Sequence, residues 1–181
     1  MIMQNDTNLV WLDLEMTGLE VESDTIIEIA SIVTDSELNV IAEGPSLAIH
    51  QSDEVLSNMN KWCIKTHGKS GLTQRVKDSK ISMAQAEFQT LEFIKKYINE
   101  NTSPLCGNSI WQDRKFLTKY MPTFESYFHY RLLDVSTLKI LSSHWYPEVY
   151  SGVSKDSKHL AMDDIKDSIE ELKYYRKHIF K

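Results

Sequence analysis

The sequence predicts an α/β domain in which a mixed five-stranded sheet is flanked by helices. Apolar runs rich in strand-forming residues come first, and from residue 52 onward stretches with helical spacing alternate with two further short strands. Strands that form a meander and then alternate with helices are typical of layered α/β folds. The chain has 181 residues, of which 41% are hydrophobic. We therefore expect a single domain over residues 1–181 with an ample core.

The strands are recognised by short apolar runs that end at turn-forming or polar residues. The first of them, Leu9–Leu12, reads as a strand that is buried on both faces and continues toward residue 15. A short polar segment at residues 35–39 joins the second and third strands, which predicts an antiparallel hairpin. The five strands are expected at residues 9–15, 26–33, 38–49, 105–108 and 131–135.

Four helices are recognised by apolar stripes and capping residues. Ser82 followed by Gln85 forms a capping box at the start of the first. Its expected apolar stripe consists of Ala84, Phe88, Leu91, Ile94 and Ile98. Two further helices are expected from Trp111 to Tyr120 and up to Trp145, the latter with Ser136 as candidate cap. The last helix is expected to bury Ile165, Ile169, Leu172, Tyr175 and Ile179.

Charge and cysteine content exclude several classes of protein. The chain has 20 Lys and Arg against 26 Asp and Glu, a net charge of −6. This balance argues against a grip on long duplex nucleic acid, because such binding neutralises phosphates with excess cations. Cys63 and Cys106 lack zinc-like spacing, so neither a zinc site nor a disulfide framework is indicated. Without a secretory-signal pattern or an apolar run of about 18 residues, we expect a cytoplasmic protein with no membrane association.

Asp13 and Glu15 lie two residues apart at the end of the first predicted strand. The alternation of a strand points both side chains to one face. Two adjacent carboxylates repel each other, and burying them without a partner is costly, so a divalent cation is the commonest reason for the pattern. The alternative is a pair that faces solvent on an edge strand. The buried appearance of the preceding residues favours the metal-binding interpretation.

Two other acidic positions lie at predicted element ends. Asp113 follows a strand and a Gly-containing turn, and by itself it is typical of a residue that the helix dipole favours near a helix start. His159 and Asp164 lie at the entry to the last helix, where Asp163 or Asp164 is also a candidate cap. Five helical residues at about 100° each would turn His159 away from Asp164. The two can therefore serve one site only if His159 lies on the preceding loop.

Taken in order, these three motifs resemble those of the DEDDh (DnaQ-like) 3′→5′ exonucleases, which have a ribonuclease H-like fold. Nearly the whole chain is similar to the oligoribonuclease family within that group. The stretches that carry the resemblance are residues 11–19, 42–45, 106–109, 128–131, 133–139 and 161–165. Trp111 departs from the pattern, because a smaller residue is expected there.

The resemblance implies a two-metal-ion mechanism. Asp13, Glu15, Asp113 and Asp164 are the implied ligands of two divalent cations, Mg²⁺ or Mn²⁺. His159 is the implied general base that takes a proton from the attacking water.

The same resemblance implies a substrate pocket. Leu19 and Trp62 would pack against the bases. The remaining implied substrate-binding residues are Ser109, Arg131, Ser136 and His67 around the 5′-terminal phosphate, Gln112, and Tyr130 reaching across a homodimer interface. The alternatives are that Leu19 and Trp62 are core residues, that Ser136 caps a helix and that Arg131 is a surface cation. Glu28, on the outer face of a strand, and Asp134, near a helix start, are interpreted as structural.

The resulting prediction is a 3′→5′ exoribonuclease that degrades very short single-stranded RNA oligonucleotides to mononucleotides. A relative specialised for tRNA trimming or DNA proofreading is the first alternative, and the implied 5′-phosphate residues favour the short substrate. An inactive exonuclease-like interaction module would lack a carboxylate or the histidine, and none is missing. A hydrolase of unrelated small molecules is opposed by the order of the motifs. The acidic net charge excludes a mode of binding, the grip on a long backbone, and leaves short oligonucleotides as ligands.

Overall fold

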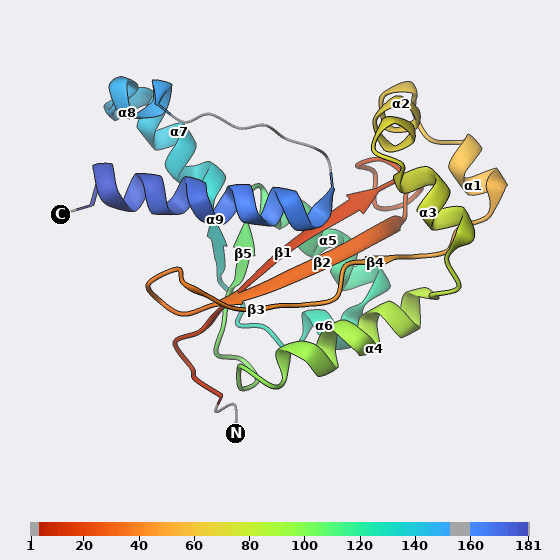
Figure 1. Cartoon of the computed structure of the whole chain (residues 1–181), viewed down its shortest axis with the longest axis horizontal. Helices are drawn as coiled ribbons and strands as arrows, with labels where there is room; N and C mark the ends of the chain where they lie inside the picture. The colour runs from red at the N-terminus through yellow and green to blue at the C-terminus, as the bar shows by residue number, and fades with distance from the viewer. Residues whose placement is uncertain (1–3, 153–159, 181) are drawn as a thin grey trace.

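The computed structural model describes residues 4–152 and 160–180, and within them a mixed sheet forms the centre of the molecule (Figure 1). The strands are β1 (Leu9–Met16), β2 (Ile26–Thr34), β3 (Val40–Glu43), β4 (Leu47–Ala48), β5 (Leu105–Gly107) and β6 (Leu132–Asp134). Their order is β3-β2-β1-β5-β6, and β4 also pairs with β2. The pairs β1–β2, β2–β3 and β2–β4 are antiparallel, whereas β1–β5 and β5–β6 are parallel.

The sheet has six strands where the sequence predicts five, because the expected strand over residues 38–49 is divided into β3 and β4. Gly44 and Pro45 lie between the two parts. Proline has no backbone N–H to donate to a ladder, so a continuous strand cannot pass through it with full pairing. The predicted hairpin between β2 and β3 is confirmed.

The described residues also form nine helices. Their bounds are α1 (Asp53–Ser57), α2 (Lys61–Lys69), α3 (Leu72–Asp78), α4 (Met83–Ile94), α5 (Ile110–Tyr120), α6 (Pro122–Glu125), α7 (Val135–Trp145), α8 (Pro147–Ser151) and α9 (Ala161–His178). None of these helices combines the length and apolar character that a membrane span requires.

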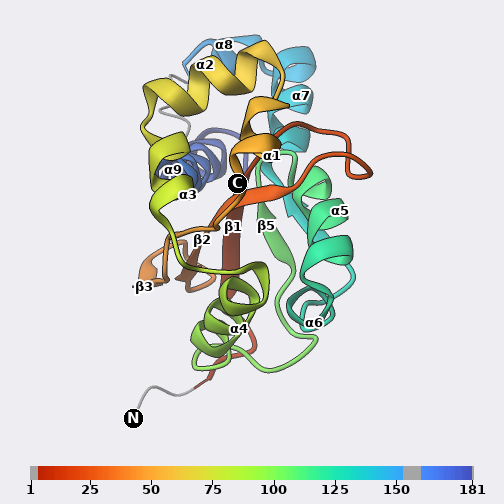
Figure 2. The same ribbon diagram turned by 90° about the vertical axis from the view of Figure 1, so that its right-hand side faces the viewer.

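The sheet is covered on both faces, and β1 shows how its residues are divided between them. Val10, Leu12 and Leu14 belong to the core on the side of α4, α5 and α6. Trp11 belongs to a second core that contains residues of α7 and α9. Figure 2 shows the sheet between α9 on one side and α5 and α6 on the other. Because side chains alternate along a strand, Asp13 and Glu15 share the face of Trp11 and point toward α9.

The last helix carries the apolar face that the sequence predicts. Ile165, Ile169 and Tyr175 are buried in the core beneath α9, and Leu172 and Ile179 pack against it. Full burial of one isoleucine side chain contributes about 1.5–3 kcal/mol to stability. This packing fixes α9 across β1 and β2, which places its first turn near the end of β1 (Figure 1).

The predicted capping box of α4 is confirmed, but two of the five residues in its predicted apolar stripe are not buried. Ser82 Oγ accepts from the Gln85 amide and Gln85 Oε1 accepts from the Ser82 amide. Ala84 and Phe88 are nevertheless exposed. The buried residues of this helix are Ala86, Thr90, Leu91 and Ile94. Spacing of three and four residues is satisfied by two adjoining faces of one helix, and the neighbouring core selects between them.

The expectation that Ser136 caps α7 is also wrong. Asp134 is the N-cap, and its Oδ1 accepts a hydrogen bond of 2.9 Å from the Ser136 amide. Because β6 runs directly into α7, the last residue of the strand is already in the capping position. Asp134 therefore starts the helix, as the sequence interpretation had it, and the hydroxyl of Ser136 is left for other partners.

Helices α1 to α3 form a small layer of their own over one end of β2. Leu56, Met59, Cys63, Leu72 and Val76 surround Ile27 in a separate buried cluster. This layer carries Trp62 and His67 on α2, so its docking on the sheet sets where those two side chains lie relative to β1.

Candidate active site

Three carboxylates from the two ends of the chain meet at the end of β1. Asp13 and Glu15 on β1 and Asp164 on α9 each offer an oxygen, and these atoms all lie within 4.8 Å of one another. β1 is a central strand between β2 and β5, so the alternative of a solvent-facing pair on an edge strand is excluded. The shared face of Asp13 and Glu15 is as predicted.

Asp113 approaches the same place from the other side of β1. It lies in the first turn of α5, is 6% exposed, and its Oδ1 accepts a hydrogen bond of 3.0 Å from the backbone amide of Leu14. Among the described residues it is outside the set that falls within 4.8 Å. Its charge is nevertheless the largest electrostatic cause of the raised pKa of Asp13. Asp113 is therefore a neighbour of the three carboxylates and is anchored to the strand that carries two of them.

Burial and mutual repulsion raise the pKa values of these acids. Burial raises the pKa of Asp13 well above its ordinary value, and the charges of Asp113, Glu15 and Asp164 raise it further. The pKa of Glu15 rises from 4.5 to about 8, first through burial and then through Asp164. The pKa of Asp113 rises from 3.8 to about 7 through burial, although the hydrogen bond from Leu14 opposes the rise.

A fifth carboxylate lies beside the cluster. This residue, Glu28, was interpreted from sequence as lying on the outer face of a strand, which is wrong. Glu28 is 1% exposed and stands opposite Glu15 in the β1–β2 register. Its Oε1 accepts from Arg75 Nη1 at 2.8 Å and from Ser46 Oγ at 3.1 Å. Its Oε2 accepts from the backbone amide of Ala161, the first residue of α9, at 3.3 Å. Glu28 therefore joins β2, α3 and the start of α9, three residues before Asp164.

The residues around the cluster fit a divalent cation. Asp13, Glu15 and Asp164 supply only oxygen atoms, which suit Mg²⁺ or Mn²⁺ better than zinc. The cationic side chain that lowers the pKa of Glu15 is Arg75, and its guanidinium is bonded to Glu28. Burial without enough positive charge nearby is what raises these pKa values. A bound divalent cation would supply the missing charge.

A cavity of about 430 Å³ opens beside the carboxylates, and it contains three of the predicted substrate-binding residues. Leu19, Trp62 and His67 line it together with Leu14, Glu15, Met16, Gly18, Asn60 and Cys63. Leu19 is 66% exposed and Trp62 is 58% exposed, so the alternative that they are core residues is wrong. Gln112 joins this pocket indirectly, because its Nε2 donates to the Leu19 carbonyl at 2.7 Å.

His67 is held against the end of β1. Its ring is 1% exposed, and its Nε2 lies 3.0 Å from the Met16 carbonyl oxygen. Because a carbonyl only accepts, Nε2 carries a hydrogen. Its Nδ1 lies 3.8 Å from Glu15 Oε2, and its ring meets Trp62 edge-on with centroids 6.4 Å apart. These contacts join His67 to Glu15 and Trp62 at the wall of the cavity.

The two predicted serines lie together at the start of α5 and α7. Their hydroxyl oxygens are 3.2 Å apart, and the Ser109 amide donates to both Ser136 Oγ and Asp134 Oδ1. Ser109 has φ of +51°, in the left-handed region that non-glycine residues rarely adopt. We refer to Ser109 and Ser136 as the serine pair. Asn108, which the sequence analysis did not single out, accepts from Ser136 Oγ at 3.1 Å.

The remaining predicted residues lie at the surface or outside the described part of the chain. Tyr130 is 72% exposed, and the guanidinium of Arg131 stacks over its ring at 5.5 Å. Trp111 is 53% exposed with Lys115 over its ring, so its large side chain is accommodated outside the core. His159 lies outside the described residues, which resume at residue 160.

Comparisons with known proteins agree with this fold and arrangement. The Exonuclease (RNase_T) family model matches residues 10–172. The oligoribonucleases of Marinobacter nauticus and Ectopseudomonas mendocina are each 62% identical over 179 residues, covering 99% of this chain and 99% of theirs. The oligoribonuclease of Colwellia psychrerythraea is 60% identical over 177 residues and 98% of both chains.

Solved structures share the fold at much lower sequence identity. Exonuclease I from Methylocaldum szegediense superposes with a TM-score of 0.73 at 18% identity over 96% of this chain. The zinc-bound exonuclease I–ssDNA complex of E. coli gives 0.74 at 16% identity over 98%. The chain spans 41% of the length of either exonuclease I. Full-length identity above 60% and the exonuclease family match lead to one conclusion: the chain belongs to the oligoribonuclease family of exonucleases.

Proposed function

We propose that this protein is a 3′→5′ exoribonuclease that degrades very short single-stranded RNA, dinucleotides included, to nucleoside 5′-monophosphates. The observation that carries the proposal is the meeting of Asp13, Glu15 and Asp164 within 4.8 Å, with Glu15 also lining the cavity that contains Leu19 and Trp62. Carboxylates that would bind cations therefore lie beside a cavity that would bind bases, and hydrolysis of a terminal phosphodiester requires both. Family membership supports the same reaction.

Asp13, Glu15, Asp113 and Asp164 would hold two divalent cations, Mg²⁺ or Mn²⁺. When bound, such ions lower the pKa of a coordinated water and stabilise the charge that develops on the phosphate. The chain contributes by fixing the carboxylates: β1 holds two, α9 one, and the Leu14 amide orients Asp113. His159 would take the proton from the attacking water, a role that suits a side chain with a pKa near neutrality.

The substrate would enter with its terminal bases against Leu19 and Trp62. Stacking on an aromatic face accepts any base, which suits an enzyme that must clear oligonucleotides of all sequences. Ser109, Ser136 and Arg131 would surround the 5′-terminal phosphate of a short substrate, together with His67 and with Tyr130 of the partner subunit. A closed 5′ end would restrict the enzyme to oligonucleotides of a few residues. Gln112 would support the pocket through its bond to the Leu19 carbonyl.

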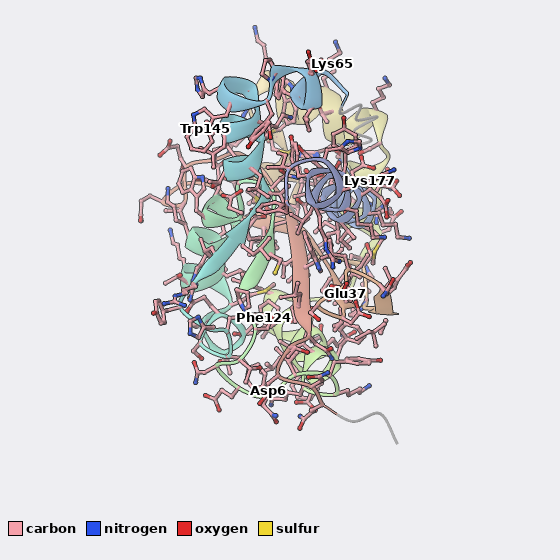
Figure 3. The ribbon with its side chains drawn as sticks, turned by 90° about the vertical axis from the view of Figure 1, so that its left-hand side faces the viewer. Asp6, Glu37, Lys65, Phe124, Trp145 and Lys177 are labelled. Atoms are coloured by element: carbon pink, nitrogen blue, oxygen red, sulfur yellow. The ribbon has the colours of Figure 1, made fainter. Side chains whose placement is uncertain are left out.

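The assembly would be a homodimer in which each subunit, one exonuclease domain over residues 1–181, completes the pocket of the other. Exposed aromatic side chains on and around α7 and α8 support this proposal, namely Tyr130, Trp145, Tyr146 and Tyr150. Figure 3 shows Trp145 at the outer surface of α7. Cys63 and Cys106 are both buried and free, which suits the reducing cytoplasm.

The test is digestion of 5′-phosphorylated RNAs from the dinucleotide to a long single strand, with Mg²⁺, with Mn²⁺ and with EDTA. We expect metal-dependent release of mononucleotides that is fastest on the shortest substrates. Equal rates on the dinucleotide and the long strand would contradict a closed 5′ end of the substrate site. Full activity in EDTA would contradict the requirement for divalent cations. A length series on Trp62→Ala, with Phe88→Ala as the control for an exposed aromatic outside the pocket, links the activity to this cavity.

A further inference from the structure

A chain of hydrogen bonds runs from α9 through Asn108 to the serine pair. Asn108 Nδ2 donates to Ser168 Oγ at 2.7 Å and to Glu171 Oε2 at 3.3 Å. On its other side, Asn108 Oδ1 accepts from Ser136 Oγ at 3.1 Å. Asn108 therefore stands between a buried carboxylate and one member of the serine pair.

Glu171 fixes which way the Asn108 amide points. Glu171 is 3% exposed, and its other oxygen, Oε1, accepts from the Tyr175 hydroxyl at 3.1 Å. An ionised carboxylate only accepts hydrogen bonds, so the Nδ2 of Asn108 must face it and the Oδ1 must face Ser136. Turning the amide over would set Asn108 Oδ1 against the carboxylate oxygen of Glu171 with no hydrogen between them, and would set Nδ2 against the hydroxyl hydrogen of Ser136.

The orientation of Asn108 then determines how the serine pair is hydrogen-bonded. A hydroxyl has one hydrogen, and that of Ser136 is directed to Asn108 Oδ1. Ser136 Oγ is thereby free to accept from the Ser109 amide at 3.0 Å, which helps hold Ser109 at its positive φ. The Ser109 hydroxyl is left as the one that can turn toward a phosphate oxygen without breaking the chain.

We propose that Asn108, oriented by Glu171, is a positioning residue for the 5′-phosphate subsite, acting through Ser136 on the direction in which Ser109 presents its hydroxyl. The inference rests on the proposed function, because it concerns the same phosphate. A merely structural Asn108 would affect folding and turnover alike on every substrate. A positioning residue affects only substrates that carry the 5′ phosphate.

The experiment exchanges the amide and the carboxylate between the two residues. Asn108→Asp places a carboxylate against the carboxylate of Glu171. In the double variant N108D/E171Q, an amide at position 171 can donate to a carboxylate at position 108, and the net charge equals that of the wild type. The readout is the ratio of kcat/KM for a diribonucleotide with a 5′ phosphate to that for its 5′-hydroxyl counterpart. We expect the ratio to fall about 10- to 100-fold in Asn108→Asp, the range for one hydrogen bond to a charged group, and to recover in the double variant.

Two further variants keep the result interpretable. If Asn108→Asp does not fold, Asn108→Ala carries the same expectation without the added charge. Asn99→Asp, on the loop after α4, is the control for an amide-to-acid change outside the site, and its ratio should match wild type. An unchanged ratio in folded Asn108 variants, or no recovery in the double variant, overturns the positioning role. Failure of the proposed function has a different signature, the absence of hydrolysis of either dinucleotide by the wild-type enzyme with Mg²⁺ or Mn²⁺.

Discussion

Removing divalent cations should make the stability of this protein fall as pH rises. In the folded chain the pKa of Glu15 is raised from 4.5 to about 8, with burial as its largest cause. A folded state that holds its proton more tightly than the unfolded chain loses stability as pH increases between those two values. The stabilisation from the neutral acid is therefore complete below about pH 4.5 and lost above about pH 8.

The size of the effect follows from the same shift. Each pKa unit corresponds to about 1.4 kcal/mol, so Glu15 alone accounts for a loss on the order of 5 kcal/mol between the two limits. Asp113, with a pKa raised from 3.8 to about 7, acts in the same direction. The two groups belong to one cluster, so their losses overlap instead of adding. For a chain of this length, 5 kcal/mol corresponds to a fall in Tm of roughly 10–20 °C.

The assay is thermal unfolding at pH 5, pH 6.5 and pH 8.5, in EDTA and in excess Mg²⁺ or Mn²⁺. We expect Tm in EDTA to fall steeply with pH and the cations to restore it most at pH 8.5, because they bind the ionised carboxylates. Glu15→Gln removes one titrating group and should flatten the pH dependence in EDTA. A Tm in EDTA that is as high at pH 8.5 as at pH 5, or a flat response to cations, would refute the reasoning.

Three other predictions follow from the contacts of single side chains. Asp164→Asn should lower kcat more than about 100-fold at saturating Mg²⁺ while the protein still folds; near-normal kcat in steady-state assays would contradict a ligand role. Arg75→Ala should lower the free energy of unfolding in urea by about 1–3 kcal/mol, because buried Glu28 then lacks a hydrogen-bond donor. Adding Glu28→Gln to the same chain should restore part of the lost stability. If the losses of the two single variants simply add in the double variant, the pairing is contradicted. Trp62→Ala should raise KM for dinucleotides about 5- to 150-fold with a smaller change in kcat, whereas Phe88→Ala should leave KM unchanged; equal effects of the two would remove stacking as the cause.

The sequence predicts the chemistry at β1 because its signal is local. The apolar run at residues 9–12 predicts a buried strand, and the alternation of side chains along that strand then places Asp13 and Glu15 on one of its faces. That Asp164 faces the same point depends on where α9 crosses the sheet. The apolar face of α9 predicts that the helix packs on the sheet, but not where it crosses β1. The packing of Ile165 and Ile169 in the core determines that position.

Two of the wrong interpretations, those of Glu28 and of the α4 stripe, depended on partners far away in the sequence. Glu28 reads as an outward strand residue because its partner Arg75 is 47 residues away and the amide of Ala161 is 133 residues away. Phe88 fits an apolar stripe, yet the core selected the adjoining face of α4. Asn108 lies in one of the stretches that carry the family resemblance, but only the fold brings Glu171 beside it and so indicates its contacts.

The separation of Asp13 and Asp164 along the chain determines when the carboxylate cluster forms. Asp13 and Glu15 lie on β1, whereas the third carboxylate and the backbone amide that donates to Glu28 belong to α9, which is synthesised much later. Contacts of such long sequence separation form late, after the loop between them has closed. A partly synthesised chain that lacks α9 therefore lacks one of the three clustered carboxylates. Activity should begin only once α9 has docked on the sheet.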